Sequence, residues 1–178
     1  VVDCHGNLFA ATPSGGWLQS SPAIPELGFA ISTRGQMGWL EPGHPSTVRP
    51  NARPRTTLTP TLVTRDGEGY IAMGTPGGDQ QDQWQLLYLL RTIVGGMSAQ
   101  EAIDAPMFHT TAAAQSFWPR EWTPRGAVIE DRAGAKVIDG LRRRGHDLTV
   151  SGPWSLGRRA AGARWRRDDS GSGEPRCR

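Results

Sequence analysis

Short stretches of alternating apolar and polar residues make up much of the chain, and a helical spacing of apolar residues is confined to a few segments. Residues 61–64, Thr-Leu-Val-Thr, and residues 69–73, Gly-Tyr-Ile-Ala-Met, are typical of β-strands. Asp66-Gly67 lies between them and is a strong hairpin signal, so we expect the two strands to pair antiparallel. From Leu86 to Val94, apolar residues recur at spacings of three and four, which predicts a helix.

The connection between the second strand and this helix reads Thr-Pro-Gly-Gly-Asp-Gln-Gln-Asp over residues 75–82. We expect Asp79 to cap the helix and Asp82 to lie in its first turn. Such a corner points the backbone N–H groups of Gly77 and Gly78 into open space, where the helix dipole adds partial positive charge. It therefore suits an anion or a developing oxyanion. A tight turn without any ligand is the alternative, and the pattern alone favours it because two glycines are a weak motif.

The remaining apolar stretches predict further short elements. Ser98 and Glu101 form a capping box for a short helix that Pro106 ends. A third helix is expected over residues 133–144, with arginines in its last turn and Gly145 after it. Residues 41–54 are polar and proline-rich and are expected to form an ordered surface loop. Additional strands are expected at residues 1–3, 8–12, 28–33, 128–130 and 147–150.

Four motifs in this chain occur in the order found in one enzyme family. They are Val-Val-Asp at residues 1–3, Arg-Pro-Arg-Thr-Thr-Leu-Thr-Pro-Thr-Leu at 53–62, Thr-Pro-Gly-Gly at 75–78, and Glu-Ala-Ile-Asp-Ala-Pro-Met-Phe-His at 101–109. Together they resemble the small, C-terminal subunit of the γ-glutamyltransferases, or glutathione hydrolases. The resemblance implies an α/β fold of the N-terminal-nucleophile type, a four-layer αββα sandwich of which this chain supplies a part.

The resemblance also implies the chemistry of the corner. In this family the first residue of the small subunit is a threonine, freed by self-cleavage, whose own α-amino group serves as the base for its hydroxyl. By alignment, that threonine would lie about five residues before Val1. The N–H groups of Gly77 and Gly78 would stabilise the oxyanion, and Ser14 would support the nucleophile with its hydroxyl. The family uses no metal and no other cofactor, and its partner is the large subunit of the same precursor.

The substrate-binding residues implied by the resemblance are Arg34, Gln36, Thr56 and Thr57. The threonine pair would hold the substrate carboxylate, and the segment with Arg34 and Gln36 lies where the family holds the substrate α-amino group. Met37 stands where an aspartate is expected, which leaves room for acyl groups other than γ-glutamyl, including those of the related cephalosporin acylases. Glu26 and Glu41 are the only acidic residues nearby, and the loop of residues 41–54 lacks an obvious lid aromatic, so we expect an open pocket.

Composition adds few constraints. The 178 residues can form one domain, and no apolar run is long enough to predict a membrane span. The first residues do not form a signal peptide, and the absence of an initiating Met fits a chain that begins part-way through a longer product. Localisation cannot be read, since any signal would lie upstream of Val1. Cys4 and Cys177 match no metal or redox spacing, and we expect free thiols.

The last part of the chain differs from the rest. From Ser155 onward, seven Arg and three acidic residues give a balance of +4, whereas the first 154 residues hold 13 basic and 14 acidic groups. We divide the chain into a small-subunit-like portion, residues 1–157, and an atypical tail, residues 158–178, expected to be disordered and hypothesised to arise from a reading-frame shift. Loss of the last family strand would then expose a sheet edge.

Three functions are compatible with these observations. The first is an N-terminal-nucleophile enzyme that hydrolyses or transfers γ-glutamyl or related acyl groups from small-molecule amides. The second is an inert fragment that lacks the nucleophile. The third is nucleic-acid binding through the Arg-rich tail. We set it aside because the tail also contains acidic residues and no known nucleic-acid-binding motif accompanies it. His109 is interpreted as a structural residue, because no metal-binding partner lies at a suitable spacing.

Overall fold

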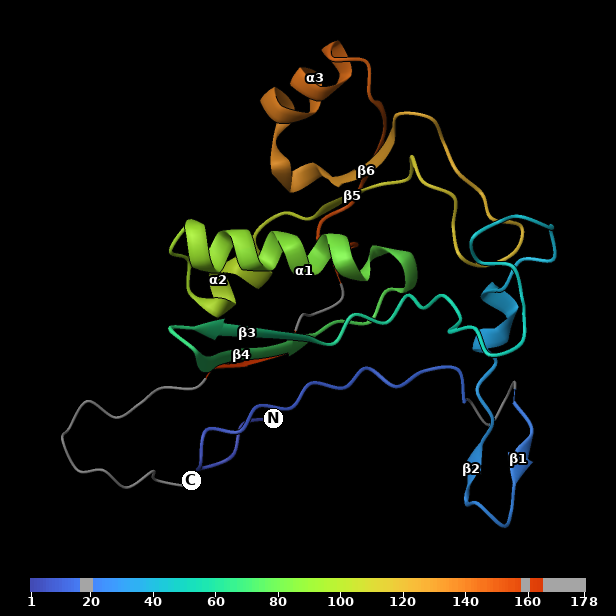
Figure 1. Ribbon diagram of the computed structural model, residues 1–178. Helices are drawn as coiled ribbons and strands as arrows, with labels where there is room; N and C mark the ends of the chain where they lie inside the picture. The colour runs from blue at the N-terminus through green and yellow to red at the C-terminus, as the bar shows by residue number, and fades with distance from the viewer. Residues whose placement is uncertain (17–20, 158–160, 165–178) are drawn as a thin grey trace.

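The computed structural model describes residues 1–16, 21–157 and 161–164. It contains both helices and β-sheets, which confirms the predicted α/β class (Figure 1). Short helical turns occur at Arg34–Met37, Gly78–Gln80 and Asp131–Ala133, and a π-helical turn occurs at Leu90–Val94. The strands and helices are β1 Ala23–Ile24, β2 Phe29–Ala30, β3 Thr61–Arg65, β4 Glu68–Gly74, α1 Gln81–Leu89, α2 Ala99–Asp104, β5 Phe108–Thr110, β6 Gly126–Glu130, α3 Ala135–Arg143, β7 Asp147–Ser151 and β8 Ala161–Arg164.

The sheet that carries the site has the order β3-β4-β8 and is antiparallel throughout. Asp66 and Gly67 form the β3–β4 turn with positive φ angles of 54° and 84°, which confirms the predicted hairpin. β8 pairs with the other side of β4, with Gly74 opposite Ala161. The expectation that loss of a late strand would leave this sheet edge exposed is therefore wrong for β4. β8 lies within the tail, residues 158–178, that was expected to be disordered, whereas residues 158–160 and 165–178 lie outside the described part, so disorder of those residues stays a prediction.

Helices α1 and α2 lie on one face of this sheet (Figure 1). Ile71 and Met73 from β4, Tyr88 from α1 and Ala102 from α2 form the buried core between them. Burial of one large apolar side chain contributes about 1.5–3 kcal/mol, so this cluster stabilises the packing of α1 and α2 on β4. The capping box of Ser98 and Glu101 begins α2 as predicted.

The apolar spacing predicted the helix correctly, but not the face that this chain buries. Leu86, Leu90 and Val94 are 57%, 47% and 79% exposed. The buried face instead carries polar and aromatic side chains, because two of its glutamines hydrogen-bond to the segment before β3. These buried residues are Gln81, Trp84, Gln85, Tyr88 and Thr92.

A second sheet, β5-β6-β7, lies beyond the helices and carries α3 (Figure 1). β5 and β6 are antiparallel, whereas β6 and β7 are parallel and are connected through α3. Ile138 is the buried apolar residue of α3. Gly145 follows the helix with a φ of +86°, the left-handed conformation expected of a glycine that ends a helix. The predicted helix and strand in this part of the chain are confirmed with small shifts of their ends.

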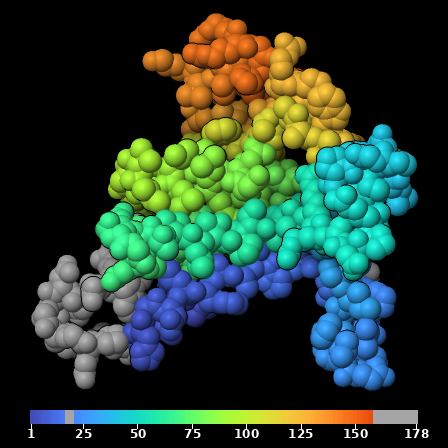
Figure 2. All heavy atoms as spheres, viewed as in Figure 1, coloured from blue at the N-terminus to red at the C-terminus, as the bar shows by residue number. Residues whose placement is uncertain are grey.

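The N-terminal segment runs beneath β4, on the side opposite the helices (Figures 1 and 2). Val2 and Leu8 form an antiparallel bridge, and the turn between them is closed by the Asp3 carboxylate, which accepts from the amides of His5 and Asn7 at 2.9 Å each. The strands predicted at residues 1–3 and 8–12 thus pair through a single bridge. Cys4 is disulfide-bonded, so the expectation of a free thiol is wrong there.

The strand predicted at residues 28–33 is limited to β2, which pairs with β1 in a small hairpin at the edge of the molecule (Figure 2). No helix within the described ranges is both long enough and apolar enough to cross a membrane. Nor do His, Cys, Asp and Glu side chains gather anywhere in those ranges as a possible metal site.

Candidate active site

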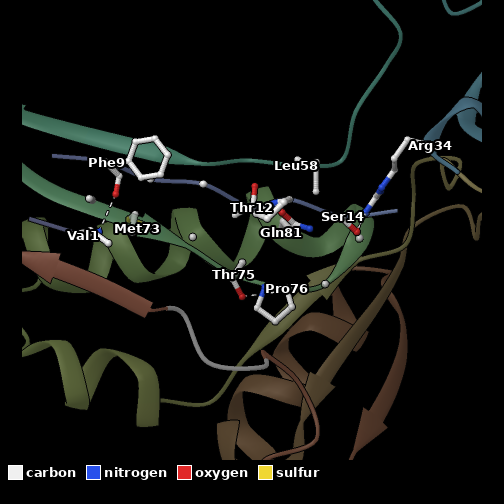
Figure 3. Close-up of a pocket in the computed structure, with 17 residues that line it drawn as sticks. Val1, Phe9, Thr12, Ser14, Arg34, Leu58, Met73, Thr75, Pro76 and Gln81 are labelled. Atoms are coloured by element: carbon white, nitrogen blue, oxygen red, sulfur yellow. Dashed lines mark hydrogen bonds between the residues drawn. The ribbon is translucent and has the colours of Figure 1, made fainter. Parts of the chain in front are cut away.

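A cavity of about 640 Å³ lies between the N-terminal segment and the end of β4 (Figure 3). Val1 and residues 9–14 form one wall, and residues 72–78 form the other. In Figure 3, Val1 and Phe9 lie at one end of this cavity, and Ser14 and Arg34 lie at the other. No residue of the 41–54 loop lines the cavity.

The Gly77-Gly78 corner has a backbone that only glycine adopts easily. Gly77 has φ +140° and Gly78 has φ +57°. A Cβ on Gly77 would lie 2.4 Å from Cζ3 of Trp84, whereas a Cβ on Gly78 would meet no atom within 4 Å. Neither glycine N–H donates a hydrogen bond to any described residue. Both amides are therefore available to a ligand in the cavity that these residues line.

Asp79 does not cap helix α1, contrary to the prediction. Its carboxylate accepts from Ser116 N at 2.8 Å and from Ser116 Oγ, and it pairs with Arg55 at 3.6 Å. The reason is the helical turn Gly78–Gln80, which delays the start of α1 and leaves Asp79 facing another segment. Asp82 does lie in the first turn of α1. Asp79 thus ties the glycine corner to the segment around Ser116 and holds it in place.

Ser14 and Arg34 meet at the far end of the cavity. Arg34 Nη2 donates to Ser14 Oγ at 2.5 Å, and Arg34 Nη1 donates to Thr57 Oγ1 at 2.7 Å. The sulfur of Met37, which is 1% exposed, lies 3.8 Å from Arg34 Nη1. One guanidinium therefore links two segments that are far apart in sequence. Ser14, Arg34, Gly77 and Gly78 all line the same cavity, as their predicted roles require.

The other predicted binding residues are placed elsewhere. Thr57 is 6% exposed and Thr56 is exposed, and both line a smaller cavity of about 190 Å³ on the far side of Gly78. Thr56 Oγ1 accepts from Leu58 N at 3.0 Å. Gln36 is exposed and lines neither cavity. Contact of these three residues with a substrate stays a prediction.

Buried glutamines of α1 are site residues that sequence reasoning missed. The side-chain amide nitrogen of Gln81, oriented from its surroundings, donates to Thr57 O at 3.1 Å and Thr75 O at 3.2 Å. Gln85 Nε2 donates to Thr59 O at 2.8 Å. These bonds fasten residues 57–59 and the start of the corner to the helix. The available signal was a pair of glutamines four residues apart, which places both on one helix face.

His109 lies behind the corner and not in the cavity. It is 7% exposed and packs edge-on against Trp84, with ring centroids 5.7 Å apart. Burial lowers the pKa of His109, so the neutral form is favoured. Its Nδ1 has no hydrogen-bond partner among the described residues. This packing against Trp84, which itself fits against Gly77, supports the structural interpretation.

Comparison with known proteins identifies the family of this chain. A sequence model of the family described as gamma-glutamyltranspeptidase matches residues 1–178. The chain is 30% identical over 166 residues to the glutathione hydrolase-like YwrD proenzyme of Bacillus subtilis (strain 168), covering 90% of this chain and 30% of that protein. Other relatives are an oxamate amidohydrolase proenzyme of Klebsiella pneumoniae and an acylase ACY 1 proenzyme of a Pseudomonas strain.

Solved structures agree with this assignment. The structure of LmbA2991HD matches at a TM-score of 0.77 with 50% identity, covering 89% of this chain and 28% of that one. The gamma-glutamyltranspeptidase from Pseudomonas nitroreducens complexed with L-DON matches at 0.70 with 22% identity, covering 93% of this chain and 87% of that one, and so shows the shared fold. The N-terminal-nucleophile hydrolase fold is thereby confirmed. The chain spans less than a third of the length of YwrD and of LmbA2991HD, and it belongs to the gamma-glutamyltranspeptidase family.

Proposed function

We propose that the complete protein hydrolyses or transfers an acyl group from a small-molecule amide through an acyl-enzyme, with γ-glutamyl amides such as glutathione or related acyl amides as substrates. One observation carries this proposal. The N–H groups of Gly77 and Gly78 are unpaired within the described chain and belong to the wall of a cavity that Ser14 shares. Two free donors in a cavity that also holds a hydroxyl form a suitable environment for a tetrahedral oxyanion.

The backbone register of the N-terminal segment indicates where a nucleophile would lie. Val1 N donates to Phe9 O at 2.8 Å, and Phe9 N donates to Val1 O at 3.0 Å, so these two residues are directly opposite. If the chain upstream of Val1 continues this antiparallel pairing, each step back from Val1 corresponds to one step forward from Phe9. The fifth residue upstream then faces Ser14, about where alignment to the family places its catalytic threonine.

The chemistry follows from these positions. The threonine α-amino group takes the hydroxyl proton as Oγ attacks the amide carbon, and the carbonyl oxygen becomes an oxyanion between Gly77 N and Gly78 N. The nitrogen of the substrate amide then takes that proton from the threonine α-amino group and leaves as an amine. The acyl group stays on the threonine Oγ as an ester. Water or an amino-acid amine attacks this ester and releases the acyl group. Each oxyanion donor contributes about 3 kcal/mol to lowering the barrier.

A second polypeptide portion is expected to cover the exposed side of α1. Leu86, Leu90, Ile93 and Val94 are each at least 44% exposed there and form an apolar stripe. The relatives named above are proenzymes, which supports a large subunit cut from the same precursor. The N-terminal segment that lines the cavity runs along the face of the sheet opposite α1 (Figure 1).

The experiment uses the complete precursor, including the sequence upstream of Val1. After self-processing, rapid mixing with γ-glutamyl-p-nitroanilide and with a cephalosporin-type amide is followed by product release and by the mass of the small subunit. We expect a product burst and one acyl group on the peptide that precedes Val1. The Ser14→Ala variant should lose about 10²-fold in kcat, whereas Ser46→Ala, remote from the cavity, should not change it. No turnover of any amide by the processed protein would favour the inert alternative.

A further inference from the structure

Arg34 is a half-buried cation for which the described residues supply no anionic partner. Its guanidinium donates to the hydroxyls of Ser14 and Thr57, and in the described part of the chain it also approaches the Met37 sulfur and the Phe117 ring, whose centroid lies 5.5 Å away. Arg34 forms no ion pair with any described residue. Hydroxyl acceptors leave the charge itself uncompensated, because they carry only partial negative charge.

The other residues of the cavity do not compensate the positive charge of Arg34 either. Among the described residues that line the cavity, Arg34 has the only charged side chain. Glu26 and Glu41 are exposed outside the cavity, and Asp79 is already engaged by Ser116 and Arg55. The end of the cavity near Ser14 therefore has a positive potential, which attracts an anion and repels an ammonium group.

The position of Arg34 also limits where that anion sits. Arg34 bonds directly to Ser14 Oγ, and the proposed nucleophile faces Ser14. A ligand group paired with Arg34 is therefore separated from the reacting carbonyl by only a few atoms. The remaining N–H donors of the guanidinium form a fork that matches the two oxygens of a carboxylate.

We propose that the acyl group accepted here carries a carboxylate that pairs with Arg34 and lacks the α-ammonium of a glutamyl group. This inference rests on the proposed function. It names the substrate class as the monoamides of short dicarboxylic acids. Met37 is consistent with it, since its buried sulfur lies 3.8 Å from Arg34 Nη1 and brings no negative charge to that position.

Three anilides that differ by one group each test the proposal on the complete processed protein. Glutaryl-p-nitroanilide has the carboxylate alone, γ-glutamyl-p-nitroanilide adds the ammonium, and pentanoyl-p-nitroanilide has neither. We expect kcat/KM for the glutaryl compound to exceed both others by about ten- to hundred-fold, the range of a hydrogen-bonded charge contact. Equal rates for the glutaryl and pentanoyl compounds, or a preference for γ-glutamyl, would overturn the proposal.

Variants separate substrate recognition from a purely positioning role. Arg34→Gln should remove the preference for glutaryl over pentanoyl, and Arg34→Lys, which keeps the charge, should retain part of it. Arg49→Gln removes an exposed arginine outside the cavity and should change none of the three rates. An equal loss on all three substrates in Arg34→Gln would show that Arg34 only positions Ser14, and would refute the assignment.

A binding measurement distinguishes failure of this inference from failure of the proposed function. Glutarate should raise the Tm of the processed protein more than pentanoate does, and Arg34→Gln should abolish the difference. An Arg34-dependent glutarate shift without turnover of any anilide would support the carboxylate site and refute the reaction. Turnover without any glutarate shift would leave the reaction standing and overturn the carboxylate site.

Discussion

Replacement of Gly77 by alanine is the sharpest test of the corner, because two independent features forbid a side chain there. Its φ of +140° lies in a region that L-residues rarely adopt, and its Cβ would lie 2.4 Å from Trp84 Cζ3. Backbone strain of this kind costs about 1–3 kcal/mol. Forcing a buried ring to move costs about 1–3 kcal/mol more.

The expected loss for Gly77→Ala is therefore about 2–6 kcal/mol of unfolding free energy, or at least about 4 °C in Tm. Any shift of the corner also misaligns an oxyanion donor, which costs about 10²–10³-fold in kcat. Urea denaturation and burst kinetics on the complete protein measure the two effects separately.

Gly78→Ala is the matched control. Its φ of +57° is left-handed, which costs about 1–2 kcal/mol, but its Cβ meets no atom within 4 Å. Combining Gly77→Ala with Trp84→Leu should recover part of the packing loss and none of the backbone loss. Equal stability of Gly77→Ala and Gly78→Ala would refute the reasoning.

Three further predictions concern the support of the site. Asp79→Ala should lower the free energy of unfolding by about 1–3 kcal/mol in urea titrations because it leaves the Ser116 donors unpaired, and Ser116→Ala should cost less. Burial lowers the pKa of His109 below its ordinary value of 6.5, so the unfolded chain binds the proton more readily and stability should fall as pH drops below about 6.5; His109→Phe should flatten that slope between pH 8 and 5. Glu130→Ala should cost about 3–5 kcal/mol by thermal or urea unfolding, because fully buried Glu130 is the ion-pair partner of Arg132.

Local signals in the sequence were sufficient for the β3–β4 hairpin and the glycine corner. Asp66-Gly67 specifies its turn through backbone preference alone, and two glycines between a strand and a helix permit the positive φ angles that this corner adopts. The capping box at Ser98 is equally local. Such elements are predictable because the residues that determine them are neighbours in the chain.

Features that depend on distant contacts could not be read in this way. Asp79 looked like a helix cap because its partner Ser116 is 37 residues away. The Arg34 contacts with Ser14 and Thr57 span 20 and 23 residues, and no spacing rule connects them. The periodicity of α1 showed an apolar stripe but could not show that this chain leaves the stripe uncovered.

The most direct test of the central claim is the position of the acyl carbonyl oxygen in a crystal structure of the complete protein, trapped as its acyl-enzyme. The account predicts that this oxygen lies about 2.7–3.1 Å from both Gly77 N and Gly78 N, with the ester on the residue opposite Ser14. An acyl group whose oxygen points away from both amides, or that is attached elsewhere in the protein, would contradict it.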